Sequence, residues 1–382
     1  MTKIINFTNV NPITIKDTYL IRKEIKKIIN SNDFILGPSV KKFEDNFSKL
    51  SQIKYSVGCA SGTDALILSL KSLNLKKHHE VIVPAMTYIS TGLSVLLNNN
   101  KLVYADIEND TGLVSIDSIV RNITKNTRAV IPVNLYGQKI NLKKLRNSIS
   151  KKIFIIEDSA QSHFAYSCFD CGNKKINNCC KKEINDQYAD ISCYSFYPAK
   201  NLGAYGDGGL VATKNREIYR KLLSLRNLGA IKKHEHNVLG INSRLDTLQA
   251  AVLNQKLKSI HKINDNRRKI AKIYDEKLKM IKHIKLTRTN PGSARHLYVI
   301  RTKHRNNLIN YLLKKKISCQ VHYPYTLNKL KPFIKYVKGN KILKNSEKWS
   351  KECLSLPIHS KMELSDANQV INEIKKFFYE NK

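Results

Sequence analysis

Short apolar runs alternate with segments of helical spacing through the first half of the chain. The apolar runs, bounded by polar or turn-forming residues, predict buried strands. The segments between them repeat their apolar positions at the period of a helix. This alternation predicts an α/β fold in which helices wrap a sheet. The predicted strands are residues 55–59, 80–83, 101–104, 129–133, 153–156, 189–195 and 209–213, and the predicted helices are 63–73, 88–97 and 215–225.

A longer helical pattern follows, from residue 244 to residue 278, with neither proline nor glycine inside it. An uninterrupted pattern of this length predicts one long helix that links two domains. We therefore expect a large domain over residues 1–250, and the linking helix with a smaller C-terminal domain over 251–382. Within the smaller domain, apolar patterns predict further α/β elements at residues 296–302, 317–321 and 367–378.

The composition limits the class of protein. A chain of 382 residues that is 42% hydrophobic can bury a sizeable core. It has no apolar stretch near the ~18 residues of a membrane span, and its first residues lack the apolar core of a signal peptide. Its eight cysteines do not reach the density of a disulfide-rich secreted scaffold. We expect a cytoplasmic protein with reduced thiols and no membrane partner.

The formal net charge of +37 raises the possibility of nucleic-acid binding through phosphate contacts. The lysines are scattered over the whole length, however, from Lys23 to Lys316, and do not gather into one arm or helix stripe. Together with the abundance of Ile and Asn, this is typical of drift under an AT-rich genome. A basic nucleic-acid-binding protein is therefore the alternative from a different class, and no nucleic-acid partner is expected.

One lysine lies in an unusual setting. Lys200 is part of SFYPAKNLGAYGDGG, which spans residues 195–209, and four glycines follow it closely: Gly203, Gly206, Gly208 and Gly209. A lysine needed only for solubility has no use for such neighbours. A lysine that must form an imine with a flat aldehyde does, because the backbone has to approach closely and turn sharply.

Two further motifs lie where strands meet helices. Asp158 follows the apolar run 153–156, at a strand end that faces the usual ligand crevice of an α/β sheet. It could also be an acidic cap for a following helix. Ser61, Gly62 and Thr63 open a predicted helix, whose first N–H groups can bind a phosphate or serve as an ordinary capped terminus. These residues alone leave both interpretations open.

The Lys200 run closely resembles the lysine segment of the DegT/DnrJ/EryC1/StrS family, the pyridoxal phosphate (PLP)-dependent sugar-nucleotide aminotransferases. Other segments resemble the family in the same order, so that the resemblance covers residues 30–360. It implies the aspartate aminotransferase-like fold (fold type I), with a large mixed sheet flanked by helices, a PLP-binding domain and a smaller C-terminal α/β domain. The other segments are FILGPSVKKFEDNF (34–47), PVNLYGQ (132–138), GINSRLDTLQAA (240–251), VHYP (321–324) and LSLPIHS (354–360).

The resemblance also implies roles for individual residues. Lys200 would carry PLP, with Asp158 against its pyridine nitrogen and Gln161 near its 3-hydroxyl group. Gly62, Thr63 and Ser195 would bind its phosphate.

Other implied roles have structural alternatives. Tyr88 would stack on the pyridine ring, although a plain core tyrosine is a rival. Asn242 would reach the PLP phosphate of a partner subunit, making an obligatory homodimer with shared sites, although asparagine is common in turns. His322 and Tyr323 are candidates for contacts with the substrate's pyrophosphate, and a histidine in apolar surroundings is often structural.

The implied reaction transfers an amino group from glutamate to a nucleotide-linked keto-6-deoxyhexose. The segment NSRLDTLQAA, preceded by His234 and His236, most resembles members that aminate dTDP-3-keto-6-deoxyhexoses. Amination at C4 of a UDP- or dTDP-4-keto-6-deoxysugar is the alternative. Lys200 argues against a family dehydratase, in which histidine replaces the lysine, and intact Lys200 and Asp158 argue against a regulatory member without activity.

The sequence departs from the family pattern between Gln161 and Tyr188, where it is longer and rich in cysteine. Cys168 and Cys171 have a CxxC spacing, but Cys179 and Cys180 are adjacent, which strains tetrahedral zinc ligation. We expect a surface loop and no metal.

Overall fold

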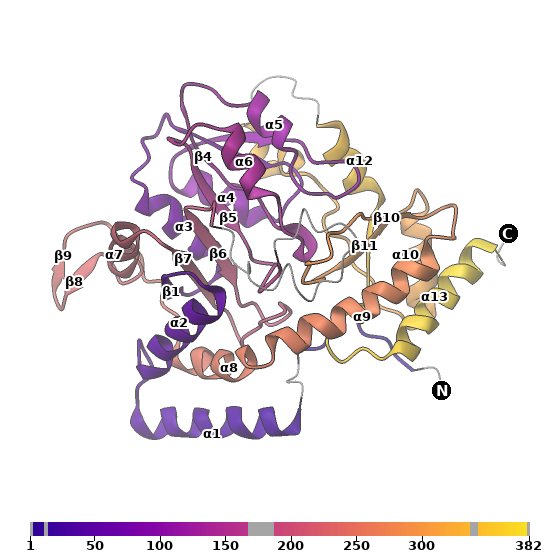
Figure 1. The fold of residues 1–382 in the computed structure, drawn as a ribbon, viewed down its shortest axis with the longest axis horizontal. Helices are drawn as coiled ribbons and strands as arrows, with labels where there is room; N and C mark the ends of the chain where they lie inside the picture. Colours follow the sequence, from indigo (N-terminus) through magenta and orange to yellow (C-terminus); the bar gives the residue numbers. More distant parts are fainter. Residues whose placement is uncertain (1–2, 11–13, 167–186, 337–342, 380–382) are drawn as a thin grey trace.

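The computed structural model describes residues 3–10, 14–166, 187–336 and 343–379 (Figure 1). Its largest sheet has the strand order β1-β7-β6-β5-β4-β2-β3. Strand β7 runs antiparallel to both of its neighbours, and the other paired strands run parallel. The strands are β1 (Tyr55–Cys59), β2 (Glu80–Pro84), β3 (Lys101–Ala105), β4 (Thr127–Val130), β5 (Phe154–Asp158), β6 (Ile191–Ser195) and β7 (Gly209–Thr213). The predicted mixed α/β sheet is confirmed.

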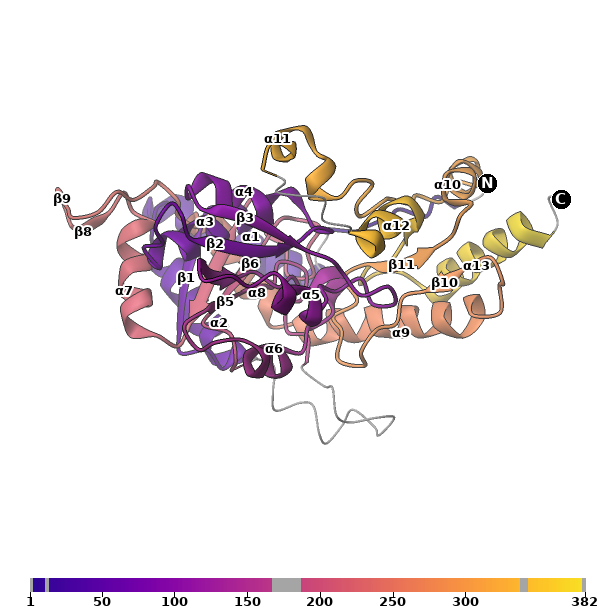
Figure 2. The ribbon, with the colours of Figure 1, turned by 90° about the horizontal axis from the view of Figure 1, so that it is seen from above.

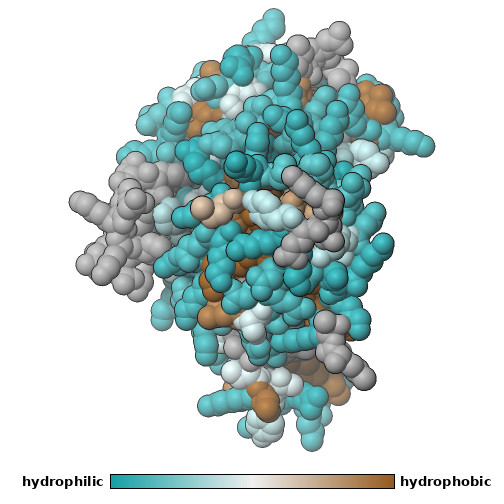
Figure 3. All heavy atoms as spheres, turned by 90° about the vertical axis from the view of Figure 1, so that its right-hand side faces the viewer, coloured by the Kyte–Doolittle hydropathy of each residue, from teal (hydrophilic) through white to brown (hydrophobic). Residues whose placement is uncertain are grey.

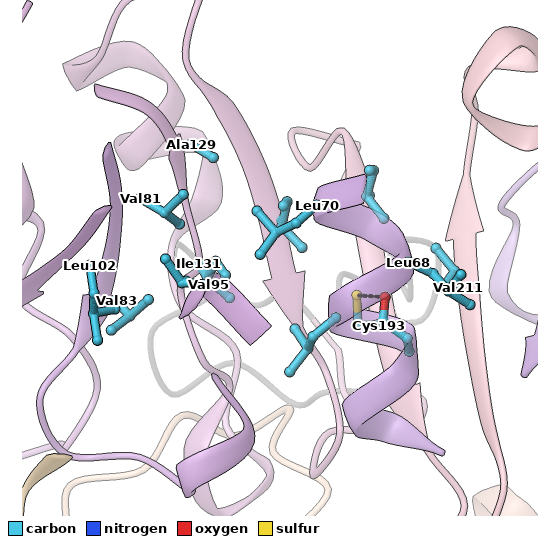
Figure 4. Close-up of a cluster of buried hydrophobic side chains, with 14 of the residues drawn as sticks. Leu68, Leu70, Val81, Val83, Val95, Leu102, Ala129, Ile131, Cys193 and Val211 are labelled. Carbon is cyan, nitrogen blue, oxygen red and sulfur yellow. Dashed lines mark hydrogen bonds between the residues drawn. The ribbon is translucent and has the colours of Figure 1, made fainter. Parts of the chain in front are cut away.

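Helices cover both faces of this sheet because the side chains of each strand alternate between the faces. In β2, Val81 and Val83 belong to one apolar core, and Ile82 belongs to another. Figure 4 shows the first core, where the side chains of Leu68 and Leu70 lie between the strands and the helix that carries both leucines. This core is covered by α3 (Gly62–Ser72), α4 (Ile89–Leu97) and α7 (Arg216–Leu225), and the other face by α2 (Pro38–Ser51), α5 (Ile116–Arg121), α6 (Leu142–Ser148) and α8 (Thr247–Leu257).

The prediction of one uninterrupted helix over residues 244–278 is wrong. Helix α8 ends at Leu257 and α9 (Ile260–Leu278) begins after Ser259, whose backbone is not helical (φ −107°, ψ 4°). Serine favours helix ends because its hydroxyl competes for backbone hydrogen bonds. The two helices also pack on different partners: α8 on α2 and on α1 (Ile15–Ser31), and α9 on α13 (Leu364–Tyr379) (Figure 1).

A smaller α/β unit follows α9, as expected. A sheet of order β10-β11-β12 packs with α9, α10 and α13 around a separate core. Residues 317–321, where an α/β element was expected, form neither a helix nor a full strand and make only isolated bridges, Ile317 to Ile5 and Gln320 to Ser355. The expected domain boundary at residue 250 stays a prediction. The elements are β10 (Lys285–Leu286), β11 (Tyr298–Arg301), α10 (Arg305–Lys314), α11 (Lys331–Ile334), α12 (Lys344–Glu352) and β12 (Cys353–Leu356), with 3-10 turns at Leu135–Gly137 and Leu327–Lys329.

The surface has two notable features. The hairpin of β8 (Ala230–Lys232) and β9 (Glu235–His236) projects from one end of the molecule, and α9 and α13 lie at the other end (Figure 2). The face at that other end is covered mainly by hydrophilic residues (Figure 3). Within the described residues, no helix is long and apolar enough to cross a membrane.

Candidate functional site

A cavity of about 490 Å³ lies at the carboxyl ends of β5 and β6, where α/β sheets usually bind ligands. Side chains from the large sheet, from α3, α4 and α9, and from the C-terminal unit line it. It brings together nine of the residues predicted from the sequence: Gly62, Thr63, Tyr88, Asp158, Gln161, Ser195, Lys200, His322 and Tyr323. Asn242 is not among the described residues that line it.

Lys200 enters the cavity from the turn that follows β6. Its N–H donates to the carbonyl of Tyr197 at 2.8 Å. Gly203 permits this tight turn, because a Cβ there would lie 2.2 Å from the carbonyl oxygen of Pro198. Burial lowers the pKa of Lys200 to about 8, and the nearby Asp158 carboxylate opposes this shift. A larger share of its amine is therefore neutral and nucleophilic near pH 7 than in an exposed lysine.

Asp158 is the last residue of β5 and is buried. The hydroxyl of Thr91 donates to its Oδ2 at 3.0 Å, and the N–H of Ala160 donates to its Oδ1 at 3.1 Å. Burial raises the pKa of the carboxyl, against the effect of both hydrogen bonds and of Lys200. Turns rather than a helix follow it up to residue 166, so the helix-cap interpretation is wrong.

The start of α3 lies against the ends of β6 and β7. The N–H of Asp64 donates to Ser61 Oγ at 3.0 Å, so Ser61 does cap the helix. A Cβ on Gly62 would lie 2.5 Å from Ser195 Cβ, and one on Gly209 would lie 2.1 Å from Ser61 O. The glycines thus let three elements meet closely. Within the first helical turn, Ser61 satisfies the N–H of Asp64, and the N–H groups of Gly62 and Thr63 are left to form a cup for an anion.

Aromatic side chains form part of the cavity lining. Tyr88 is 56% exposed, which rules out a plain core tyrosine, and its ring centroid lies 5.8 Å from that of Tyr323. Gln161 Nε2 donates to the hydroxyl of Tyr323 at 3.1 Å, and its Oε1 accepts from the N–H of Tyr136 at 2.7 Å. The two hydrogen bonds fix the amide of Gln161 beside Tyr323.

His322 contacts the hydroxyl of Ser355 through Nδ1 at 2.9 Å. Burial and, to a smaller extent, the charge of Lys200 lower the pKa of His322 to about 4. This histidine is therefore neutral near pH 7, and it can contact a substrate only as a neutral donor or acceptor.

Thr91 and Arg267 are among the cavity residues that were not predicted from the sequence. Thr91 orients Asp158, and Arg267 of α9 reaches the cavity wall. A signal for Arg267 does exist, because it occupies a core position of its helix, four residues after Ile263 and three before Ile270. A charged residue on the apolar face of a helix is expensive to bury and needs an explanation.

Asn242 is exposed and pairs with Asn227 through an isolated β-bridge, away from the cavity of its own chain. Cys168, Cys171, Cys179 and Cys180 lie outside the described residues. Among the residues that are described, no group of three or more His, Cys, Asp or Glu side chains could hold a metal ion.

The residues around the cavity fit PLP. An amine of lowered pKa, a buried and oriented carboxylate, a helix terminus and an aromatic ring line one cavity. These are the groups that would bind an aldehyde, a pyridine nitrogen, a phosphate and a ring face.

Comparison with known proteins agrees with this geometry. The sequence profile of the DegT/DnrJ/EryC1/StrS aminotransferase family matches residues 16–375. The dTDP-3-amino-3,6-dideoxy-alpha-D-galactopyranose transaminase of Aneurinibacillus thermoaerophilus is 34% identical over 98% of this chain and 100% of its own length. The dTDP-3-amino-3,4,6-trideoxy-alpha-D-glucose transaminase of Streptomyces venezuelae is 32% identical over 92% of this chain and 90% of its own.

The fold comparison leads to the same family. The crystal structure of S. venezuelae DesV in complex with a ketimine intermediate superposes with a TM-score of 0.92 and 30% identity, and the match covers 99% of both chains. A family match over most of the chain, a shared fold and a cavity suited to PLP support one conclusion. The chain belongs to the DegT/DnrJ/EryC1/StrS aminotransferase family and is a PLP-dependent sugar aminotransferase.

Proposed function

We propose that this enzyme transfers the amino group of glutamate to C3 of a dTDP-linked 3-keto-6-deoxyhexose, giving the 3-amino sugar nucleotide. The main observation in support of amino transfer is that Lys200 and Asp158 lie close together in one cavity. The names of the relatives from A. thermoaerophilus and S. venezuelae support a dTDP-linked 3-amino sugar. Amination at C4 of a UDP- or dTDP-4-keto-6-deoxysugar is the alternative.

Most of the proposed cofactor contacts come from the large sheet and its helices. Gly62, Thr63 and Ser195 would bind the phosphate of PLP, and Tyr88 would cover its ring. The carboxylate of Asp158, held by Thr91 and Ala160, would keep a proton on the pyridine nitrogen. When bound, PLP supplies the aldehyde that takes up the amino group and the ring that stabilises negative charge.

Lys200 would have two tasks. Its neutral amine would attach the cofactor, and once released it would move a proton at the α-carbon of glutamate as base and then acid. The lowered pKa of Lys200 supports both tasks, because proton transfer is most efficient when the pKa of the group lies near the working pH. The same lysine would serve the keto sugar in the second half of the reaction.

We also propose a homodimer in which Asn242 contacts the phosphate bound by the partner subunit. The support is that Asn242 is exposed and lies outside its own cavity. Large apolar side chains are also exposed nearby and on α1, including Leu239 at 87% and Ile15 at 91%. An interface between subunits would remove such side chains from water.

A substrate panel tests the proposed specificity. The enzyme, PLP and L-glutamate would be incubated with dTDP-3-keto-6-deoxyhexose, dTDP-4-keto-6-deoxyhexose and the UDP-linked 4-keto sugar. Product formation would then be followed by mass spectrometry. We expect kcat/KM to favour the dTDP-3-keto sugar by at least about tenfold. An equal or higher value for a 4-keto sugar would contradict C3 specificity but leave amino transfer intact.

A further inference from the structure

A buried arginine in the cavity wall has no acidic partner among the residues that the structure describes. Arg267 is 3% exposed, and none of the ion pairs between described residues includes it. Its neighbour Arg268 pairs with Asp265 at 2.7 Å. Taking a charge out of water is costly unless an opposite charge or hydrogen bonds compensate for it. Burial lowers the pKa of Arg267 to about 10, so the side chain is still a cation near pH 7.

The hydrogen bonds of Arg267 satisfy only one of its nitrogen atoms. Nη1 donates to the carbonyls of His296 at 2.9 Å and Ile358 at 3.0 Å, with a longer contact of 3.5 Å to Arg295. Nε is buried without a partner, and no acceptor for Nη2 exists within the described residues. Nη2 is therefore the guanidinium nitrogen left to donate to a bound anion. An N–H of a guanidinium forms a strong, charge-assisted hydrogen bond with a carboxylate.

The position of Arg267 indicates which anion it binds. Arg267 lines the same cavity as Lys200 and Asp158, and it also lines a smaller recess that includes Lys200. The cofactor phosphate already has the start of α3 as its cup. A sugar nucleotide is bulky and must extend to the open side of the cavity, whereas Arg267 is almost fully buried. A compact carboxylate suits this position better than a diphosphate.

We infer that Arg267 binds a carboxylate of the amino donor and of the 2-oxo acid left after amino transfer. This inference rests on the proposed function, because it takes glutamate as the donor. Arg267 would hold the donor beside Lys200, with its guanidinium positioned in advance by the carbonyls of His296 and Ile358. The binding energy of a remote group would thus position the reacting carbon.

Glutarate, a dicarboxylate without an amine, tests binding apart from turnover. Its affinity for the PLP-loaded enzyme would be measured by calorimetry for the wild type, Arg267→Gln and Arg267→Lys. The matched control is Arg268→Gln, since Arg268 is the next residue of α9 and donates to Ser293 O and Asp265. We expect Arg267→Gln to weaken glutarate binding about 10- to 100-fold, because charged hydrogen bonds are lost. Arg268→Gln should stay within about threefold of the wild type.

Half-reactions identify the carboxylate. Rapid mixing would compare L-glutamate with L-glutamine, which lacks the side-chain carboxylate, and with 4-aminobutanoate, which lacks the carboxylate at the aminated carbon. Arg267→Gln should slow the half-reaction of every donor except the one that lacks the carboxylate bound by Arg267. The KM for the keto sugar nucleotide in the second half-reaction should remain within about threefold of the wild type.

Several results would overturn the inference. Unchanged glutarate affinity in Arg267→Gln would do so, and so would weaker binding of dTDP, which would assign the guanidinium to the diphosphate. An equal loss in both half-reactions together with lower thermal stability would indicate a structural role only. If Arg267→Gln does not fold, the same measurements can be made on Arg267→Lys, because lysine keeps the positive charge but lacks the planar guanidinium group. Should no keto sugar be aminated while glutarate binding still depends on Arg267, the proposed function would fail and this inference would stand.

Discussion

At the scale of single residues, the environment of Lys200 predicts how the apoprotein takes up PLP. Only the neutral amine attacks an aldehyde, and the pKa of Lys200 is about 8 instead of the usual 10.5. The rate of PLP uptake should therefore rise with pH and level off above about pH 8. Stopped-flow measurements of apoprotein mixed with PLP between pH 6 and 10 would locate the midpoint.

The Asp158 carboxylate raises the pKa of Lys200, so Asp158→Asn should move this midpoint to lower pH. A midpoint near that of an exposed lysine, unaffected by Asp158→Asn, would contradict the described electrostatics.

Asp158 itself should matter more for turnover than for cofactor binding. An amide cannot keep the ring nitrogen protonated, so Asp158→Asn should lower kcat by about 30- to 1000-fold, or about 2–4 kcal/mol. Thr91→Val removes one hydrogen bond to the carboxylate and should cost less, about tenfold. Steady-state kinetics at saturating PLP checks both values. An unchanged kcat in Asp158→Asn would refute the assigned role.

At the scale of elements, close packing between β7 and α3 creates the proposed phosphate cup. A Cβ at Gly209 would lie 2.1 Å from the backbone oxygen of Ser61, so Gly209→Ala must displace the start of α3. We expect weaker PLP binding and a loss of about 1–3 kcal/mol in the free energy of unfolding.

Gly206→Ala is the matched control for this prediction. A Cβ at Gly206 meets only the end of the Gln249 side chain, at 3.0 Å, and that side chain can move aside. Fluorescence titration with PLP and thermal unfolding would compare the two variants. Equal effects in both would argue against the packing explanation.

The sequence predicted elements well where the local pattern was strong. Strands β1 and β7 match their predicted ranges, and β2 and β3 differ by one residue at their ends. The break at Ser259 was missed because apolar spacing continues across it, and only the different packing partners of α8 and α9 reveal it. Residues 317–321 were expected to contribute an α/β element, but they make only isolated bridges.

The cavity was predictable for a different reason. Lys200, Asp158 and Gly62 belong to segments that resemble the family, so their grouping could be expected before the fold was known. Thr91 and Arg267 come from helices whose orientation depends on tertiary packing. No local sequence pattern predicts that α9 lies beside the cavity, so the role of Arg267 can be inferred only from the structure.

At the scale of the whole molecule, the proposed shared site can be tested by mixing inactive chains. If Asn242 acts in the partner's site, a Lys200→Ala chain paired with an Asn242→Ala chain has one doubly damaged site and one intact site. Mixtures should then recover activity above either parent. The test needs chains that exchange and an impaired Asn242→Ala parent. With both conditions met, flat activity would place Asn242 within its own chain's site.

A second buried lysine, Lys256, provides a control for the role of Lys200. Burial also lowers the pKa of Lys256 to about 8, but its amine donates to the carbonyl of Gly203 at 2.8 Å. If the cavity and not the low pKa alone selects the reactive lysine, Lys256→Met should bind PLP as the wild type does.

The role of Lys200 can be tested through the near-visible absorbance of the purified protein with PLP, measured before and after addition of L-glutamate. We expect an absorbance band of lysine-bound PLP in the wild type and in Lys256→Met. Glutamate should bleach this band with formation of 2-oxoglutarate. Lys200→Ala and Lys200→Arg should fold but show neither the band nor turnover. Normal amino transfer from glutamate to a keto sugar nucleotide by Lys200→Ala would contradict the catalytic role of Lys200.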